Sequence, residues 1–231
     1  MQLMLLLSGD RANFTTVAVD LEKGELKVLA NYPAPYNVSW AEPVSSHGNI
    51  DRLVGLSEGE EAGLLFTFEI DHAHKTCRIT SQQPTLGAPA HIITLQDKSA
   101  LAIGTYLGGS ASLYPRIPNV LYASNRWERH IAKREPHLKN VPTKLPQGDT
   151  ITIILLSDNG RRVQETKHVR TNLDTIRGFR LRYDGNYVVV VGQEGGGIEI
   201  YSIGGVRGDL WTLTASLSEG LESGIKHAVW L

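Results

Sequence analysis

Short apolar runs separated by glycine-rich or polar turns recur along most of the chain. The clearest example lies in residues 181–215, where two apolar runs flank an Asp184-Gly185 turn and two more follow at 198–203 and 210–215. Asp-Gly between two such runs is a strong hairpin signal. Four short antiparallel strands joined by such turns are typical of one blade of a β-propeller.

The same pattern predicts strands in four other units of the chain. Both faces of most runs are apolar, as expected for sheets that stack between neighbouring sheets. The predicted strands are 3–7, 15–19 and 25–29, with a turn at Lys23-Gly24; 38–41, 52–56, 63–69 and 76–80; 91–95, 100–104 and 110–114; 120–124, 150–156 and 164–169; and a lone final strand, 225–230.

The strand counts at the two ends of the chain predict how a ring would close. The first unit has three strands and the last has one, and propellers commonly complete one blade with strands from both termini, which hides strand edges. At roughly 40–45 residues per blade the chain supplies about five blades. The fold class predicted is therefore all-β: a β-propeller of four-stranded antiparallel blades, incomplete, with closure by the N- and C-terminal strands.

The blade pattern breaks between Tyr114 and Leu121. One blade stops after its third strand, and the next begins at what should be its second. We therefore expect one domain over residues 1–231 with an internal junction near 115–116, where the fold departs from a regular ring. The strand edges of an incomplete blade are expected to favour self-association.

Composition narrows the classes of partner. The formal net charge is −1, so no bulk field favours nucleic acid or an anionic membrane. A single cysteine, Cys77, excludes a disulfide framework within the chain and fits a reducing compartment. The apolar run at residues 3–7 is too short to span a membrane and lacks a basic flank. We expect a cytoplasmic protein with no nucleic-acid or membrane partner.

Several local motifs have a plain structural explanation. The basic, proline-rich stretch 127–148 is interpreted as a surface loop, with nucleic-acid contact as the alternative. Asp71, His72 and His74 lie in a predicted hairpin turn with no third metal ligand at suitable spacing. The glycines of 192–197 precede a strand, so they are no dinucleotide-binding motif. Cys77 lies in an alternating strand, which favours packing over nucleophilic chemistry.

A set of motifs in the C-terminal half resembles a known family. They are Tyr122-Ala-Ser-Asn-Arg126, Gly148-Asp-Thr-Ile-Thr-Ile153, Thr175-Ile-Arg-Gly-Phe179, Asp184-Gly-Asn-Tyr-Val-Val-Val-Val191 and Gln193-Glu194, in that order. They resemble the lactonase seven-bladed propeller family, which includes 6-phosphogluconolactonases and fungal 3-carboxy-cis,cis-muconate lactonising enzymes. Residues 38–40 and 224–230 look closer to the fungal branch.

The resemblance implies a metal-free, cofactor-independent site for a small anionic lactone or carboxylate. Arg126 matches a proposed catalytic arginine of the fungal enzymes. Arg177 matches a strand start near the family's central channel, and a surface or blade-bridging arginine is the alternative. His91 and Glu194 are further candidates for substrate binding; a packed histidine and a carboxylate that accepts turn amides are the respective alternatives.

The resemblance also implies that part of the family's active site is missing from this chain. The central blades, which carry a histidine, an arginine and a glutamate of the proposed fungal active site, have no matching positions here. Lactone hydrolysis and muconate cycloisomerisation both need a proton-transfer group beside fixed cations. Two functions therefore remain open: lactone chemistry of the family's kind, or a non-catalytic propeller, which is either a binding scaffold or an inactive, truncated paralogue. We expect little or no lactonase or lactonising turnover.

Overall fold

The computed structural model describes residues 3–59, 62–86, 89–94, 101–105, 120–124, 148–157, 162–194 and 196–231. Every regular element in these residues is a β-strand, and seventeen strands form five antiparallel sheets. Within the same residues no helix is long and apolar enough to cross a membrane. The predicted all-β fold class is confirmed.

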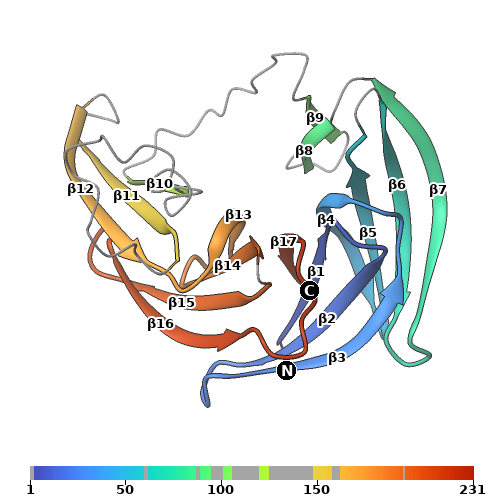
Figure 1. Cartoon of the computed structure of the whole chain (residues 1–231), viewed down its shortest axis with the longest axis horizontal. Helices are drawn as coiled ribbons and strands as arrows, with labels where there is room; N and C mark the ends of the chain where they lie inside the picture. The colour runs from blue at the N-terminus through green and yellow to red at the C-terminus, as the bar shows by residue number, and fades with distance from the viewer. Residues whose placement is uncertain are drawn as a thin grey trace. The chain divides into compact units, whose positions relative to one another are not determined.

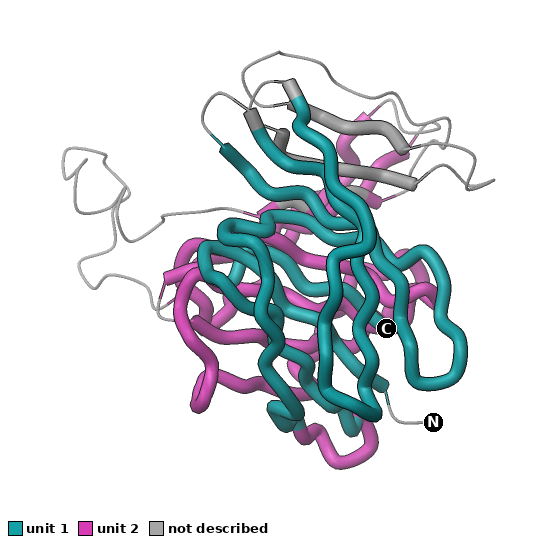
Figure 2. Tube along the Cα trace, turned by 90° about the vertical axis from the view of Figure 1, so that its right-hand side faces the viewer, with its two compact units in different colours: residues 1–20, 26–114, 225–231 teal, residues 21–25, 115–224 magenta. Residues whose placement is uncertain are grey.

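The chain divides into two compact units, which are coloured separately in Figure 2. Unit 1 comprises residues 1–20, 26–114 and 225–231, and unit 2 comprises residues 21–25 and 115–224. The prediction of a single domain over 1–231, with its junction near 115–116, stays a prediction. Residues 106–119 and 125–147 lie outside the described residues, and with them all of the basic stretch 127–148 except Gly148.

The first sheet of unit 1 joins both ends of the chain. Its strand order is β17-β1-β2-β3, and Figure 1 shows the red β17 beside the blue β1. Leu6 pairs with Val229 and Ser8 pairs with His227. The predicted closure of one blade by the N- and C-terminal strands is therefore confirmed. The strands are β1 (Leu3–Gly9), β2 (Asn13–Asp20), β3 (Glu25–Pro33) and β17 (Ile225–Trp230).

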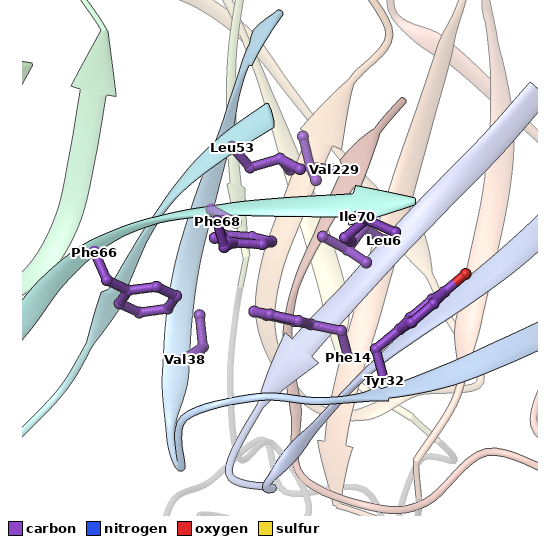
Figure 3. Packing of buried hydrophobic residues seen from close by; sticks show 10 residues of the cluster. Leu6, Phe14, Tyr32, Val38, Leu53, Phe66, Phe68, Ile70 and Val229 are labelled. Atoms are coloured by element: carbon purple, nitrogen blue, oxygen red, sulfur yellow. The ribbon is translucent and has the colours of Figure 1, made fainter. Parts of the chain in front are cut away.

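The second sheet of unit 1 packs against the first. Figure 3 shows Leu6 and Phe14 of the first sheet converging with Phe68 of the second. The rings of Phe14 and Phe68 stack with centroids 4.7 Å apart, and burying each such side chain contributes about 1.5–3 kcal/mol. The strands of this second sheet are β4 (Val38–His47), β5 (Ile50–Ser57), β6 (Ala62–Asp71) and β7 (Thr76–Leu86). A two-stranded sheet of β8 (Pro89–Thr94) and β9 (Leu101–Thr105) completes the described part of unit 1.

Unit 2 contains one three-stranded and one four-stranded sheet. Residues 171–173 connect β12, the last strand of the three-stranded sheet, to β13, the first strand of the four-stranded sheet. In unit 1, β3 is the fourth strand of the first sheet and likewise leads into β4, the first strand of the second sheet. The three-stranded sheet thus corresponds to the second, third and fourth strands of a blade, as the sequence predicts. The strands are β10 (Val120–Ser124), β11 (Thr150–Ser157) and β12 (Arg162–Arg170), then β13 (Asp174–Leu181), β14 (Tyr187–Glu194), β15 (Ile198–Gly204) and β16 (Leu210–Leu217).

The core of unit 2 lies between these two sheets. Ile151 packs with Ile176, Val188, Val190 and Tyr201, and all five side chains are buried. The predicted Asp184-Gly185 hairpin turn is present: Gly185 has φ +73°, a conformation that glycine adopts without penalty. Of the valines that follow this turn, Val188 and Val190 lie in the core of unit 2, and Val189 and Val191 are also fully buried.

Candidate anion-binding site in the second unit

The structure brings two of the four sequence-predicted site residues to the same end of one sheet. Arg177 lies in β13 and Glu194 ends β14, where Glu194 pairs with Asp174. His91 lies in β8 of unit 1 and its backbone pairs with Gly104; its side chain lies outside the described part. Arg126 lies outside the described residues. The roles assigned to Arg126, His91, Arg177 and Glu194 stay predictions.

Arg177 lies on a β-bulge. Ile176 pairs with Gly192 and Gly178 pairs with Val191, so β13 has one more residue than β14 across this interval, and Arg177 is the extra one. A bulge removes a residue from the regular ladder and re-aims its side chain. The neighbours Thr175 and Ile176 are buried while Arg177 is half-exposed, so part of Arg177 lies at the surface of the sheet.

Asp149 anchors the chain that leads into β13. Its side chain is 1% exposed, and its Oδ2 accepts hydrogen bonds from the backbone N–H of Thr175 (2.8 Å) and of Ile176 (3.3 Å). Its own N–H donates to the carbonyl of Leu173 (2.7 Å), and its carbonyl accepts from the N–H of Thr171 (3.0 Å). A single buried residue therefore holds both the connection 171–173 and the first residues of β13.

Thr175 has a left-handed backbone conformation, with φ +56°. This conformation costs an L-residue roughly 1–2 kcal/mol, and a β-branched side chain makes it rarer still. The Thr175 hydroxyl is buried and has no hydrogen-bond partner among the described residues. The conformation is thus not held by the side chain of Thr175, and the bond from its N–H to Asp149 is the contact that accompanies it.

A second buried carboxylate supports the same connection. Glu199 is 2% exposed, and its Oε1 accepts from the backbone N–H (3.1 Å) and the side-chain amide (2.9 Å) of Asn172. The hydroxyl of Tyr201 donates to Glu199 Oε2 at 2.5 Å. Burial, and then the neighbouring Glu199 carboxylate, raise the pKa of Tyr201, so this hydroxyl stays protonated and a donor at neutral pH.

The described residues at this end of unit 2 combine buried and surface carboxylates with one arginine. Asp149 and Glu199 accept bonds from backbone amides, and Arg177 supplies a cation at the surface. Exposed Glu194 and half-exposed Asp174, paired across β13 and β14, add two carboxylates. Such a set can hold an anionic group at the guanidinium and hydroxyl groups at the carboxylates.

Sequence reasoning missed the two buried carboxylates and also a buried lysine in unit 1. Lys226 is 8% exposed, and its Nζ lies 2.8 Å from Asp10 Oδ1, 2.7 Å from Asn37 Oδ1 and 3.3 Å from Glu58 Oε2. Next to it, buried His227 stacks on Trp40 with ring centroids 4.2 Å apart. The only signal in the sequence was two polar residues within the apolar final strand.

The predicted hairpin turn after residue 69 is present, and Cys77 contacts the core as predicted. Asp71 and His74 lie in the β6–β7 turn and bond each other at 2.7 Å, while His72 bonds Asp51 at 2.7 Å; among the described residues no group of three ligands is suited to a metal ion. Cys77 packs against the core of unit 1, and burial raises the pKa of its thiol to about 11. Its thiolate is therefore scarce at neutral pH, as a packing role requires.

Comparison with known proteins finds one family that resembles most of the second unit. Residues 117–223, slightly under half of the chain, match the family described as "Lactonase, 7-bladed beta-propeller". This segment of the chain is similar to the lactonase propeller family. It contains β10 to β16, and hence Asp149, Arg177, Glu194 and Glu199. No curated protein matches the chain.

The solved structures that resemble this chain share little sequence with it. A candidate 6-phosphogluconolactonase from Bacteroides fragilis is 16% identical, with 96% of this chain and 83% of that chain covered and a TM-score of 0.45. One from Bacteroides uniformis is 14% identical, with 96% and 84% covered and a TM-score of 0.46. The periplasmic gluconolactonase PpgL of Pseudomonas aeruginosa is 9% identical, with 97% and 82% covered and a TM-score of 0.39. At these values we draw no functional argument from the likeness.

Proposed function

We propose that this lactonase-type chain binds a small anionic lactone or carboxylate at Arg177, and that it turns such a ligand over slowly or not at all. The observation that carries the proposal is the bulge at Arg177 within the segment that matches the lactonase family. Buried Asp149 supports this bulge by accepting a hydrogen bond from the backbone N–H of Thr175. We further propose a cytoplasmic location. The catalytic role that the family resemblance implies for Arg126 remains a proposal that rests on that resemblance alone.

The binding part of the proposal rests on the properties of arginine. A guanidinium is planar and always charged, and it binds a carboxylate or phosphate with two parallel hydrogen bonds. A charge-assisted bond of this kind contributes roughly 1.5–3 kcal/mol. Because β13 and its bulge fix the backbone of Arg177, little order has to be imposed when the ligand arrives.

The slow turnover is supported by the bonds of the carboxylates in the described part of unit 2. Lactone hydrolysis needs a base that activates water, and cycloisomerisation needs an acid that protonates the developing carbanion. Asp149 and Glu199 already accept bonds from backbone amides. Glu194 is exposed, at the end of a strand, and is the residue through which the alternative, an active lactonase or cycloisomerase, would operate.

Calorimetric titration of the purified full chain with 6-phosphogluconate tests binding. Assays with 6-phosphogluconolactone and with 3-carboxy-cis,cis-muconate test turnover. We expect Arg177→Ala to weaken 6-phosphogluconate binding by roughly 10- to 150-fold. Arg180→Ala is the matched control, because Arg180 lies in the same strand but pairs regularly, with Val189; its affinity should stay close to that of the unaltered chain.

Three results would count against the proposal. Absence of 6-phosphogluconate binding by the unaltered chain, or an equal loss in Arg177→Ala and Arg180→Ala, would remove the specific anion site. Substantial turnover of either substrate that Glu194→Gln abolishes would replace slow turnover with the enzyme alternative.

A further inference from the structure

We propose that Asp149 is a positioning residue: it holds Thr175 in the left-handed conformation and thereby creates the bulge that places Arg177. The inference deepens the proposed function, and it rests on that function only in treating Arg177 as a ligand-binding residue. The claim that Asp149 fixes the backbone of Thr175 and the bulge rests on contacts within unit 2 and on no ligand.

The contacts of Asp149 select this conformation. Its Oδ2 accepts from two consecutive amides, those of Thr175 and Ile176. Two successive N–H groups that point at one oxygen require a local turn of the backbone, since in a regular strand successive amides point to opposite sides. The left-handed φ of Thr175 supplies that turn.

The bulge follows directly after this turn. Asp174 pairs with Glu194 and Ile176 with Gly192, and the register then shifts between Ile176 and Gly178. The side chain of Ile176 is buried in the core of unit 2, which fixes one end of the extra residue. With Thr175 held by Asp149 and Ile176 held by packing, Arg177 has to be the residue displaced from the ladder.

The surroundings of Asp149 are built to keep it in place. A side chain at position 148 is excluded, because a Cβ on Gly148 would lie 2.0 Å from the carbonyl oxygen of Thr171. The Arg170 guanidinium donates to the Gly148 carbonyl at 3.0 Å, and the Thr171 hydroxyl donates to the Asp149 carbonyl at 2.8 Å. Asp149 is therefore bonded through its backbone on both sides as well as through its carboxylate.

A double substitution separates positioning from simple structural support. Asp149→Ala removes the acceptor, so Thr175 loses the contact that offsets its left-handed conformation; affinity for 6-phosphogluconate should fall about tenfold. Thr175→Gly alone should change affinity little, because glycine adopts positive φ readily. Combining Thr175→Gly with Asp149→Ala should restore most of the lost affinity. Asp149→Asn, which keeps one acceptor oxygen, should lie between Asp149→Ala and the unaltered chain.

Glu199→Gln is the matched control among buried carboxylates. Glu199 bonds Asn172 on the same connection, whereas the amides of Thr175 and Ile176 donate to Asp149. It should lower the melting temperature without the loss of affinity that Asp149→Ala shows. Amide hydrogen exchange over residues 174–178 gives a second readout, and it should accelerate in Asp149→Ala only.

The outcomes distinguish this inference from the proposed function. If Thr175→Gly fails to restore affinity to folded Asp149→Ala, or Glu199→Gln weakens binding equally, positioning through Thr175 is wrong. If the unaltered chain binds no 6-phosphogluconate, the proposed function fails. The conformational part is then judged by a crystal structure of Asp149→Ala: retention of both the left-handed Thr175 and the bulge would overturn it, and their loss would support it.

Discussion

Each unit has a basic residue near the start of the strand that comes first in the strand order of a sheet: Lys226 in β17 and Arg177 in β13. The surroundings of these two residues differ. Lys226, the second residue of β17, is buried and bonded to Asp10, Asn37 and Glu58. Arg177, the fourth residue of β13, is half-exposed on a bulge. In unit 1 the carboxylates of Asp10 and Glu58 bond the Lys226 ammonium. In unit 2 the buried carboxylates of Asp149 and Glu199 accept hydrogen bonds from backbone amides.

The comparison shows two ways in which the connections between strands are held together. A buried ammonium has to be neutralised, so Lys226 ties the β1–β2 turn, the β3–β4 connection and the β5–β6 turn together and serves stability. In unit 2, Asp149 and Glu199 bond the backbone of β13 and of the connection 171–173, and Arg177 is half-exposed. We propose recognition as the role of Arg177.

The largest expected effect comes from Lys226→Met. It leaves Asp10 and Glu58 without their cation at a largely buried point, and breaking a buried ion pair costs about 3–5 kcal/mol. Because both carboxylates are partly exposed, we expect a loss of about 2–4 kcal/mol in the free energy of unfolding, measured with urea. Lys27→Met, on exposed β3, should change it by less than about 0.5 kcal/mol. Equal effects of the two substitutions would contradict the structural role of Lys226.

Gly148→Ala should come next, because it disturbs the support of Asp149 directly. The new Cβ would meet the Thr171 carbonyl oxygen at 2.0 Å, at a residue with φ +70°. Gly185→Ala is the control: its φ is +73°, but nothing lies within 4 Å of the added Cβ. We expect Gly148→Ala to cost about 1–3 kcal/mol more than Gly185→Ala in urea unfolding. Similar losses of unfolding free energy in the two variants would show that the connection 171–173 moves easily to admit a side chain. This outcome would contradict a rigid support for Arg177.

Glu199→Gln should have a smaller effect on stability. Gln keeps one acceptor oxygen for Asn172 but replaces the other with a donor that faces the Tyr201 hydroxyl. A hydrogen bond to a charged group contributes about 1.5–3 kcal/mol, and part of it survives, so a loss of about 1–2 kcal/mol is expected in thermal unfolding. The Tyr201 pKa, followed by ultraviolet titration, should fall, since its neighbouring negative charge is gone. An unchanged Tyr201 titration would contradict the Glu199–Tyr201 bond.

The smallest effect concerns the exposed Asp71–His74 pair in unit 1. The Asp71 carboxylate raises the pKa of His74, and His74 lowers the pKa of Asp71. The His74 contribution to stability is complete below the unfolded histidine pKa and is lost as pH rises through the raised value. The Asp71 contribution is present above the unfolded aspartate pKa and is lost as pH falls through the lowered value.

The pair should therefore stabilise unit 1 most between the ordinary pKa values of aspartate and histidine. The difference in urea midpoint between the unaltered chain and His74→Ala should be larger at about pH 5 than at about pH 8.5. His47→Ala, at the end of β4, is the control. A difference that grows toward alkaline pH would contradict the pairing.

The sequence by itself determined the strands and their grouping into blades. The runs at Val120–Ser124 and Ile225–Trp230 coincide with β10 and β17, because a strand's apolar pattern and its flanking turn residues are local properties. Closure of the first sheet by β17 followed from counting strands, since an unpaired edge is unfavourable. Longer strands, such as β4 and β7, extend beyond the predicted runs because exposed polar residues also pair there.

Tertiary structure alone decided which polar residues became buried supports and which one stayed at the surface. Lys226 meets Asn37 and Glu58 across 189 and 168 residues, and Asp149 meets Thr175 across 26. Such contacts arise where turns of different strands gather at one end of a sheet, and no local period encodes them. The bulge at Arg177 is equally hidden, because a one-residue shift in register depends on what holds Thr175 and Ile176, namely a carboxylate from another strand connection and the packing of the core.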